Sequence, residues 1–412
     1  MIGRAGPASL SFWQFYAPGG PVAEQAQWFE TLVKQWNDTN SVKVTLQYVP
    51  NSEYMNGSKL QTAFASGSGP DLFLISPGDF LRYSNARMLL DLTPYIDATA
   101  QKDFPDSVIA TRKVGGRIFG VPMEVEPMAM YYSVAAFEKA GLNEHDIPKD
   151  WESLIELGKR LTTRDQFGLL FETTPGYYQN FNWYPFLWQG GGDIQKGGKS
   201  SFNSPATIQA LKFWQDSIRS KAAPRKPLGG GAWDIVPNLA SGYCAMQNCG
   251  IWGIGALRSN AKDFRYGVFP LPLPKGGRPV TIGGGWAFVA NAHSGNPDAA
   301  GRFCAWALAS SKPDSIQRVA DWCTVAKSDM PPRLSAFTQA ASAYDKGFLK
   351  LFKDEIYPTT RGEPRVPPQV YKIVSDAIQE CQLNGQDPAA QAGSASQQID
   401  DYLATYSGAP II

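Results

Sequence analysis

Histidine and cysteine are scarce in this chain, and their spacing excludes the common metal-binding patterns. The 412 residues contain two histidines and five cysteines, and no two cysteines stand in a CxxC arrangement. Structural zinc sites take four such ligands at short, regular spacings. We therefore expect neither a metal nor any other cofactor.

The cysteines leave the question of disulfides open. Cys244 and Cys249 flank one predicted strand, and extended residues rise about 3.3 Å each, so their sulfurs would lie roughly 16 Å apart. That separation exceeds the roughly 7 Å between Cα atoms that a disulfide spans. Cys304 and Cys323 lie on consecutive predicted helices and could pair. Five free, buried thiols are the alternative.

Neither sign of charge is in excess, and long apolar runs are absent. Thirty-eight basic residues face 37 acidic ones, for a net charge of +1. Because nucleic-acid-binding proteins carry a basic face, we expect no nucleic-acid partner. No apolar stretch is long enough for a membrane span. Residues 1–10 have no apolar signal core, so an exported protein would have lost its signal peptide.

Aromatic residues, in contrast, are abundant. The chain has 12 tryptophans, 17 tyrosines and 22 phenylalanines. Most aromatic side chains fill protein cores, but their flat faces also stack on the C–H faces of sugar rings. The tryptophan surplus therefore favours a carbohydrate ligand.

Strand and helix periodicities alternate along the chain. Residues 9–15, 42–48 and 72–75 read as strands, and residues 21–38 and 54–66 between them read as helices. This βαβαβ order predicts a parallel sheet covered by helices. Capping residues predict further helices after Asp150, Ser204 and Asn296. The chain is too long for one ordinary core and suits two lobes.

Short motifs follow in an order that resembles a known family. Gly69-Pro70-Asp71-Leu72, Gly120-Val121-Pro122, Met130-Tyr131-Tyr132, the run 137–142 (FEKAGL) and Gln189-Gly190-Gly191-Gly192 are similar to segments of the family 1 extracellular solute-binding proteins. This group includes maltose-binding and glycerol-3-phosphate-binding proteins. The resemblance extends from about Ser9 to Leu403. The chain departs from it at Arg87-Met88, where a glycine is usual, and at Ser133, which replaces an asparagine.

The resemblance implies a two-lobed α/β fold of the periplasmic-binding-protein type. Each lobe would be a mainly parallel sheet with flanking helices, and the chain would cross a multi-strand hinge near 124–128, 280–284 and 326–333. Residues 1–125 and 283–330 would form the first lobe. Residues 126–282 and 331–412 would form the second, with the C-terminal helices packed on the hinge.

The same resemblance implies a function. Such a protein is a monomer outside the cytoplasm, in the periplasm or as a surface lipoprotein. It closes on a small carbohydrate, does no chemistry on it and delivers it to the membrane permease subunits of an ABC importer.

Residues that follow predicted strands are candidate ligand contacts, because ligands of open α/β sheets lie beyond the carboxyl ends of the strands. Gln14 and Tyr16 follow the first strand, and Ser76 and Asp79 follow the third. A carboxylate such as that of Asp79 can accept two sugar hydroxyls, although it could instead cap the next helix. Asp71 precedes its strand and is expected to be structural.

A second group of candidates is aromatic. Tyr177, Tyr178 and Trp183 lie in a segment that we predict to be a loop, because it follows Pro175 and Gly176. Trp252 follows a strand, Trp286 follows Gly284 and Gly285, and Trp233 follows three glycines. Glycines would let a ligand approach the backbone while a neighbouring ring stacks on it.

Charged candidates lie near the expected hinge. One of Glu124 and Glu126 is expected to face the ligand, with Glu124 slightly favoured, because both lie at the first expected hinge crossing. Arg361 and Arg365 could bind hydroxyls, a phosphate or a carboxylate, or could form an inter-lobe salt bridge.

The charged candidates leave the class of ligand open. The tryptophans favour a neutral oligosaccharide, whereas the arginines would suit an anionic sugar derivative or a glycerophosphodiester. An exported glycosidase is the enzymatic alternative, because Glu124, Glu126 and Asp79 could supply its two carboxylates.

Overall fold

The computed structural model describes residues 9–55 and 57–412, which form two mixed sheets with helices around them. The first sheet has the strand order β2-β1-β3-β13-β6. Its strands are β1 (Ser9–Gln14), β2 (Lys43–Tyr48), β3 (Leu72–Ile75), β6 (Val121–Pro122) and β13 (Ala287–Ala290).

The βαβαβ prediction for the first lobe is confirmed. β1 pairs in parallel with β2 and β3, so that Phe12 lies opposite both Leu46 and Leu72. All four residues of β3 are buried, as expected where helices cover both faces of a parallel sheet. Asp71 is structural, because its carboxylate accepts hydrogen bonds from the Ser11 amide and the Ser294 hydroxyl.

The helices of the first lobe include α1, whose Phe29, Val33 and Trp36 turn toward the core. The predicted helix 54–66 is instead two short helices, and Gly57 just before the second has a left-handed φ of 69°. The first-lobe helices are α1 (Ala23–Thr39), α2 (Asn51–Met55), α3 (Ser58–Ala65), α4 (Pro77–Asn85), α5 (Ala98–Lys102), α6 (Asp106–Ile109), α12 (Pro297–Leu308), α13 (Pro313–Asp321) and α14 (Leu334–Gln339). A small hairpin, β4 (Lys113–Val114) with β5 (Arg117–Ile118), lies among them.

The second sheet is built around the fully buried strand β7 (Glu126–Ser133). β10 (Met246–Gly250), β11 (Tyr266–Phe269) and β12 (Thr281–Gly284) all pair antiparallel to β7, and β14 (Thr360–Gly362) pairs in parallel with β12. The expectation of a mainly parallel sheet is therefore wrong for this lobe. β7 leads away from the first sheet, and β10, β11 and β12 run back against it. In the first sheet, β13 likewise enters from the second lobe and runs against β3.

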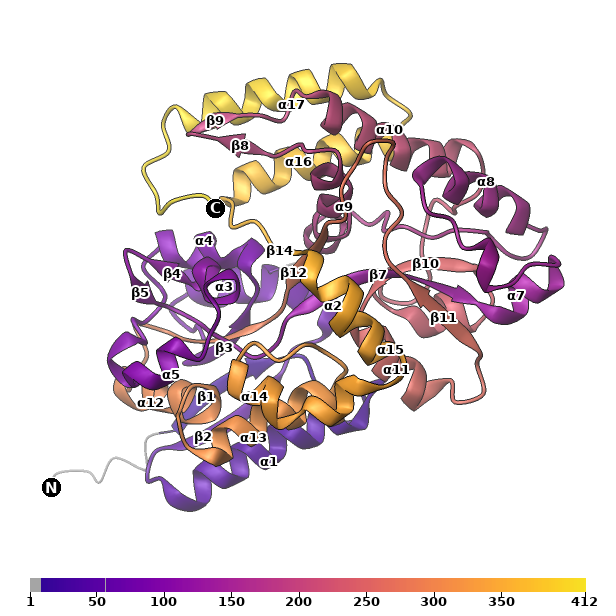
Figure 1. Ribbon diagram of the computed structural model, residues 1–412. Helices are drawn as coiled ribbons and strands as arrows, with labels where there is room; N and C mark the ends of the chain where they lie inside the picture. The colour runs from indigo at the N-terminus through magenta and orange to yellow at the C-terminus, as the bar shows by residue number, and fades with distance from the viewer. Residues whose placement is uncertain (1–8, 56) are drawn as a thin grey trace, which may run out of the picture.

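Helices cover the second sheet, and the predicted caps are confirmed. The side chains of Asp150, Ser204 and Asn296 accept hydrogen bonds from backbone N–H groups at the starts of α8, α10 and α12. Figure 1 shows α16 and α17 beside α10, at the opposite end of the molecule from α1 and α13. The helices of the second lobe are α7 (Val134–Lys139), α8 (Trp151–Leu161), α9 (Tyr177–Gln189), α10 (Pro205–Arg219), α11 (Trp252–Asn260), α15 (Gly347–Leu351), α16 (Pro368–Gln382) and α17 (Pro388–Leu403).

The chain passes between the sheets more than once. It leaves β6 for β7 through residues 123–125 and leaves β12 for β13 through residues 285–286. Met330 pairs with Val125 at the hinge, but α14 then packs back on α13. The chain reaches the second sheet at α15, where Phe348 packs on Tyr266 at 4.9 Å between ring centroids. This last passage therefore comes later than the segment 326–333 that the family pattern implies.

Several smaller expectations can also be compared with the structure. All five cysteines are free and buried, so Cys304 and Cys323 do not pair. In the part of the chain that is described, no helix combines the length and apolar character needed to cross a bilayer. The hairpin β8 (Gln195–Lys196) and β9 (Lys199–Ser200) is closed by two exposed glycines and forms a surface turn. The two sheets and their helices confirm the α/β class.

Candidate functional site

A cavity of about 160 Å³ lies between the two sheets. The first lobe contributes Tyr16, which follows β1, and Trp286, which precedes β13. The second lobe contributes Tyr177 at the start of α9 and Trp252 at the start of α11. The cavity is therefore assembled from segments far apart in sequence, and a change in the distance between the lobes would open or close it.

The wall of this first cavity is mainly apolar and rich in aromatic rings. The rings of the wall pack against one another, which restricts their motion. The ring centroids of Phe15 and Trp286 are 4.9 Å apart, and those of Tyr178 and Trp252 are 6.0 Å apart. Such fixed rings offer flat apolar faces without losing rotamer freedom when a ligand binds. The aromatic residues of the wall are Phe15, Tyr16, Tyr177, Tyr178, Phe181, Trp233, Trp252 and Trp286.

A second cavity, of about 590 Å³, adjoins the first and shares Met55, Ser76, Tyr177 and Trp286 with it. Its charged side chains form two pairs of opposite charge. Arg82 lies 2.6 Å from Asp79.

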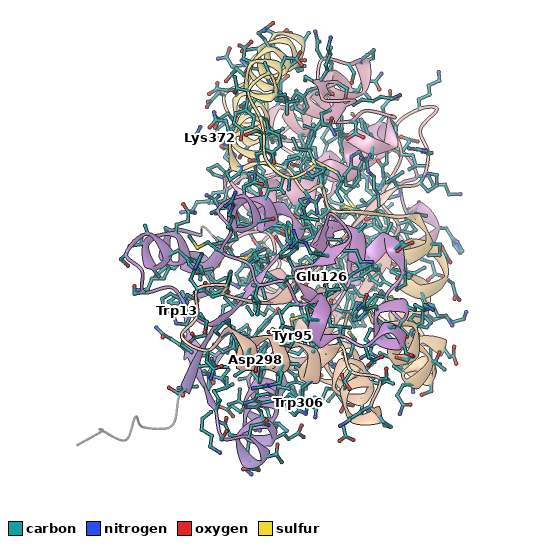
Figure 2. The ribbon with its side chains drawn as sticks, turned by 90° about the vertical axis from the view of Figure 1, so that its left-hand side faces the viewer. Trp13, Tyr95, Glu126, Asp298, Trp306 and Lys372 are labelled. Carbon is teal, nitrogen blue, oxygen red and sulfur yellow. The ribbon has the colours of Figure 1, made fainter. Side chains whose placement is uncertain are left out.

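The other pair comes from α16. Lys372 lies 2.5 Å from Asp376, and Figure 2 labels Lys372 on the outer part of the second lobe. Asp79 thus lines the cleft, as the sequence predicts, but its carboxylate is already paired with a cation. The second cavity is therefore more polar than the first and close to neutral.

The hinge beside the first cavity holds one lysine among three carboxylates. The ammonium nitrogen of Lys327 lies 3.1 Å from Glu124 and 3.2 Å from Asp329, and it also donates to Glu126. All four groups are buried, and Figure 2 places Glu126 in the interior of the molecule. The carboxylate oxygens lie within 4.8 Å of one another, a spacing that suits a metal ion, but the lysine already supplies the cation.

Burial controls ionisation in this cluster. It raises the pKa of Glu126 and of Asp329, although Lys327 pulls both in the opposite direction. Burial also opposes the charge of Lys327, but Asp329, Glu124 and Glu126 outweigh that effect and raise its pKa. Lys327 therefore keeps its positive charge, and the neighbouring carboxyl groups already pair with it.

Glu124 and Gln14 do not line either cavity. Glu124 is fully buried and accepts hydrogen bonds from the Trp286 amide at 3.2 Å and the Trp322 indole at 2.5 Å. Gln14 is bonded to the backbone of Tyr16. Of the two hinge glutamates, Glu126 reaches the cavity, whereas the sequence analysis slightly favours Glu124.

Arg361 and Arg365 also lie outside both cavities. Arg361 pairs with Asp193 at 2.7 Å and stacks over the Trp188 ring at 4.5 Å. Arg365 is buried and donates to the carbonyl oxygens of Lys113 at 2.5 Å and Pro410 at 2.7 Å. Neither guanidinium group is placed to hold a ligand, and Arg365 instead fastens the C-terminal segment to the first lobe.

The segment predicted as a loop around Tyr177 is a helix, so that prediction was wrong. Aromatic residues and asparagine are weak helix formers, and Pro185 lies inside the helix. Residues 178–189 are all buried, so tertiary packing decides the conformation. Tyr177 and Tyr178, at the start of α9, line the first cavity. The side chain of Trp183 is fully buried in the second lobe.

Gly284 and Gly285 serve the packing of the hinge. A Cβ atom on Gly284 would lie 2.3 Å from the Phe181 ring, and one on Gly285 would lie 2.4 Å from the Glu124 carbonyl oxygen. Gly285 also has a φ of 120°, which side chains rarely allow. Neither glycine lines the cavities.

The sequence interpretation missed Phe181, Asp234 and Lys327 among the residues of the first cavity. Asp234 directly follows Trp233, so the glycine-rich segment before that tryptophan was a usable signal. Lys327 could be placed only by knowing how the chain folds back on the hinge.

A cavity between two hinged α/β lobes is the arrangement of the two-lobed solute-binding proteins. The model of the family described as bacterial extracellular solute-binding protein matches residues 19–311, and the chain belongs to this family.

Known proteins resemble the chain over most of its length. The arabinooligosaccharide-binding protein of Bacillus subtilis is 25% identical over 323 residues, which cover 75% of this chain and 71% of that protein. A solute-binding protein from Thermotoga lettingae bound to α-D-tagatose superposes with a TM-score of 0.81 at 21% identity, over 96% of this chain and all of the other. UgpB from Mycobacterium tuberculosis, in complex with glycerophosphocholine, has a TM-score of 0.76 at 20% identity, over 97% and 99%.

Proposed function

We propose that this protein is the substrate-binding subunit of a bacterial ABC importer and that it captures a neutral carbohydrate by closing its two lobes. The observation that carries the proposal is the first cavity, whose wall is aromatic on both lobes. Sugar rings offer C–H faces to such walls and hydroxyl groups to the polar side chains between them.

The charges around the cavities support a neutral rather than an anionic ligand. Among the described residues, Lys327 is the cation that lines the first cavity, and three carboxylates surround it. Asp234 adds another carboxylate to the wall. A phosphate or carboxylate ligand would need an unpaired cation, and the two arginines that could supply one are engaged elsewhere.

The relatives support the same class of ligand. One relative is an arabinooligosaccharide-binding protein, and one structural neighbour is bound to α-D-tagatose. The neighbour bound to glycerophosphocholine shows that the fold also accepts a phosphodiester. The lack of a free guanidinium group beside the described cavities favours the sugar.

We further propose that the protein binds its ligand without chemical change, as a monomer outside the cytoplasm, in the periplasm or as a lipoprotein, and hands it to permease subunits. A glycosidase needs two carboxyl groups placed about the bond to be cleaved. Glu124 is sealed behind Trp286 and Trp322, and Asp79 is paired with Arg82.

A thermal-shift panel tests the proposal. Arabinotriose, maltotriose and D-tagatose are compared with sn-glycerol 3-phosphate, and each mixture is then analysed by chromatography. A ligand at a hundredfold excess over its Kd stabilises the folded state by about 2.7 kcal/mol. We expect a shift with at least one neutral sugar, no shift with the phosphate and no new products.

Two tryptophan variants serve as a matched pair. Trp252→Ala removes a wall of the first cavity and should abolish the shift. Trp306→Ala removes a ring that packs under Arg318, 3.8 Å from its centroid, in the outer part of the first lobe. That variant should lower the melting temperature yet keep the ligand shift. Product formation, or a shift with the phosphate alone, would overturn the proposal.

A further inference from the structure

The loop 228–234, called the tryptophan loop below, presents Trp233 and Asp234 to the first cavity. Its backbone is held by buried polar side chains from other parts of the second lobe. The Glu172 carboxylate accepts a hydrogen bond from the Ala232 amide at 2.7 Å. The Gln247 side chain donates to the Ala232 carbonyl oxygen, also at 2.7 Å. The N–H and C=O groups of Ala232 are thus both hydrogen-bonded to buried side chains.

Asn238 fixes the remainder of the loop. Its side-chain oxygen accepts from the Leu228 amide at 2.8 Å. Its amide nitrogen donates to the carbonyl oxygens of Gly231 at 3.1 Å and Asp234 at 2.7 Å. Asn238, Glu172 and Gln247 are all at most 1% exposed. Water does not compete for these hydrogen bonds, so they set the path of the loop.

The glycines of the loop close its shape around the indole of Trp233. That indole donates to the Gly230 carbonyl oxygen at 3.0 Å, and a Cβ atom on Gly230 would lie 2.4 Å from the ring. Gly231 has a φ of 139°, and its Cβ atom would lie 2.8 Å from the Glu172 carboxylate. The Trp252 indole donates to the Trp233 carbonyl oxygen at 3.0 Å, which joins the two aromatic walls.

Glu172 differs from the other two polar residues because it uses both carboxylate oxygens as acceptors. One oxygen accepts from the amides of Thr173 at 2.9 Å and Thr174 at 2.8 Å, and the other accepts from Ala232. A glutamine could satisfy one side, but its NH₂ group would face a backbone N–H donor on the other.

We propose that Glu172 is a positioning residue of the ligand site, which holds the tryptophan loop in its binding conformation before the ligand arrives. The inference rests on the proposed function, because it assigns a role within the same cavity. A loop that is ordered in advance spares the ligand the entropy of ordering it. Glu172 lies outside both cavities and acts through the backbone of Ala232.

The test compares Glu172→Gln with Asp103→Asn in the 412-residue chain. Asp103 is a matched control because its carboxylate also accepts a backbone N–H, from Ser335 at 2.8 Å, and pairs with Arg333, but in the first lobe. Hydrogen exchange of the tryptophan loop is measured without ligand, and arabinotriose and maltotriose are the binding probes. For Glu172→Gln we expect exchange about tenfold faster and affinity about tenfold weaker, since one lost buried hydrogen bond corresponds to that factor. Asp103→Asn should change neither.

Gly231→Ala keeps the test decisive if Glu172→Gln folds poorly, because its Cβ atom, 2.8 Å from the Glu172 carboxylate, would disturb the same contact without removing a buried hydrogen-bonding group. It should reproduce both effects. Unchanged exchange of the loop in both variants would overturn the proposal, and so would faster exchange with unchanged affinity. If the wild-type chain binds neither probe, the proposed ligand class is at fault. Exchange then decides on Glu172 by itself.

Discussion

Glu363 is a buried carboxyl group at the contact between the two lobes. It follows β14 and accepts a hydrogen bond from the Tyr177 hydroxyl at 2.6 Å. Burial raises the pKa of Glu363 to about 8, although Tyr177 and Arg112 act in the opposite direction. The folded protein therefore favours the protonated form of this side chain over a pH range in which the unfolded chain would ionise it.

The raised pKa predicts how stability depends on pH. The contribution of Glu363 to the free energy of unfolding is complete below its ordinary pKa of 4.5 and is lost as the pH rises through about 8. Glu126, whose pKa burial also raises, contributes in the same direction. Melting temperatures measured from pH 5 to pH 8.5 should fall, and the fall should be smaller in Glu363→Gln.

Glu138→Gln is the control for this pH series. Glu138 is exposed and pairs with Arg265 on the surface, so its removal should leave the wild-type slope. A slope in Glu363→Gln as steep as that of the wild type would show that the buried carboxyl group does not carry the pH dependence.

The sequence predicted only in part which individual side chains line the cavities. Tyr16 and Ser76, which follow predicted strands, and Trp286, which follows two glycines, line the cavities. Arg361 and Arg365 are candidates because of their chemistry and their expected place near the hinge. Their partners, Asp193 and the carbonyl oxygens of distant segments, depend on contacts that no local pattern encodes.

At the scale of elements, the N-terminal end of α4 is where the first lobe meets the second. A Cβ atom on Gly78 would lie 2.6 Å from both the Tyr177 ring and the Glu363 carboxylate. These two groups hydrogen-bond each other, so neither can move away independently. The absence of a side chain at Gly78 therefore permits the close approach of α9 to α4.

Gly78→Ala should oppose closure of the lobes. We expect its affinity for the saccharide selected by the thermal-shift panel to fall about tenfold, because the closed state must absorb roughly 1–3 kcal/mol of overpacking. Gly295→Ala is the matched control, since a Cβ atom there meets nothing within 4 Å. Titration calorimetry compares the two. Equal affinities would mean that the contact at α4 does not limit closure.

Elements with a clear period and clear caps were predictable, whereas elements set by tertiary packing were not. α8, α10 and α12 begin at the capping residues read from the sequence. α9 was missed because its aromatic residues and Pro185 have low helix propensity, and the helix is stabilised by burial instead. The direction of β10 and β11 relative to β7 was missed because pairing direction depends on how the chain returns to the hinge.

At the scale of the whole molecule, the two lobes followed from the order of the motifs, and the cavity between them followed from the fold. The last passage of the chain between the lobes comes after α14 because Arg333 ties the preceding segment to Asp103 in the first lobe. Figure 1 shows the consequence, with the C-terminal helices α16 and α17 capping the second lobe far from α1.

The proposed ligand is a neutral carbohydrate that binds between aromatic walls from both lobes. The most direct measurement is a calorimetric titration, at several temperatures, of the wild-type chain with the saccharide that gives the largest thermal shift. We expect one saturating site with a negative heat-capacity change, because apolar ring faces are buried on binding. Saturable binding of sn-glycerol 3-phosphate, with no heat from any neutral sugar in the panel, would contradict it.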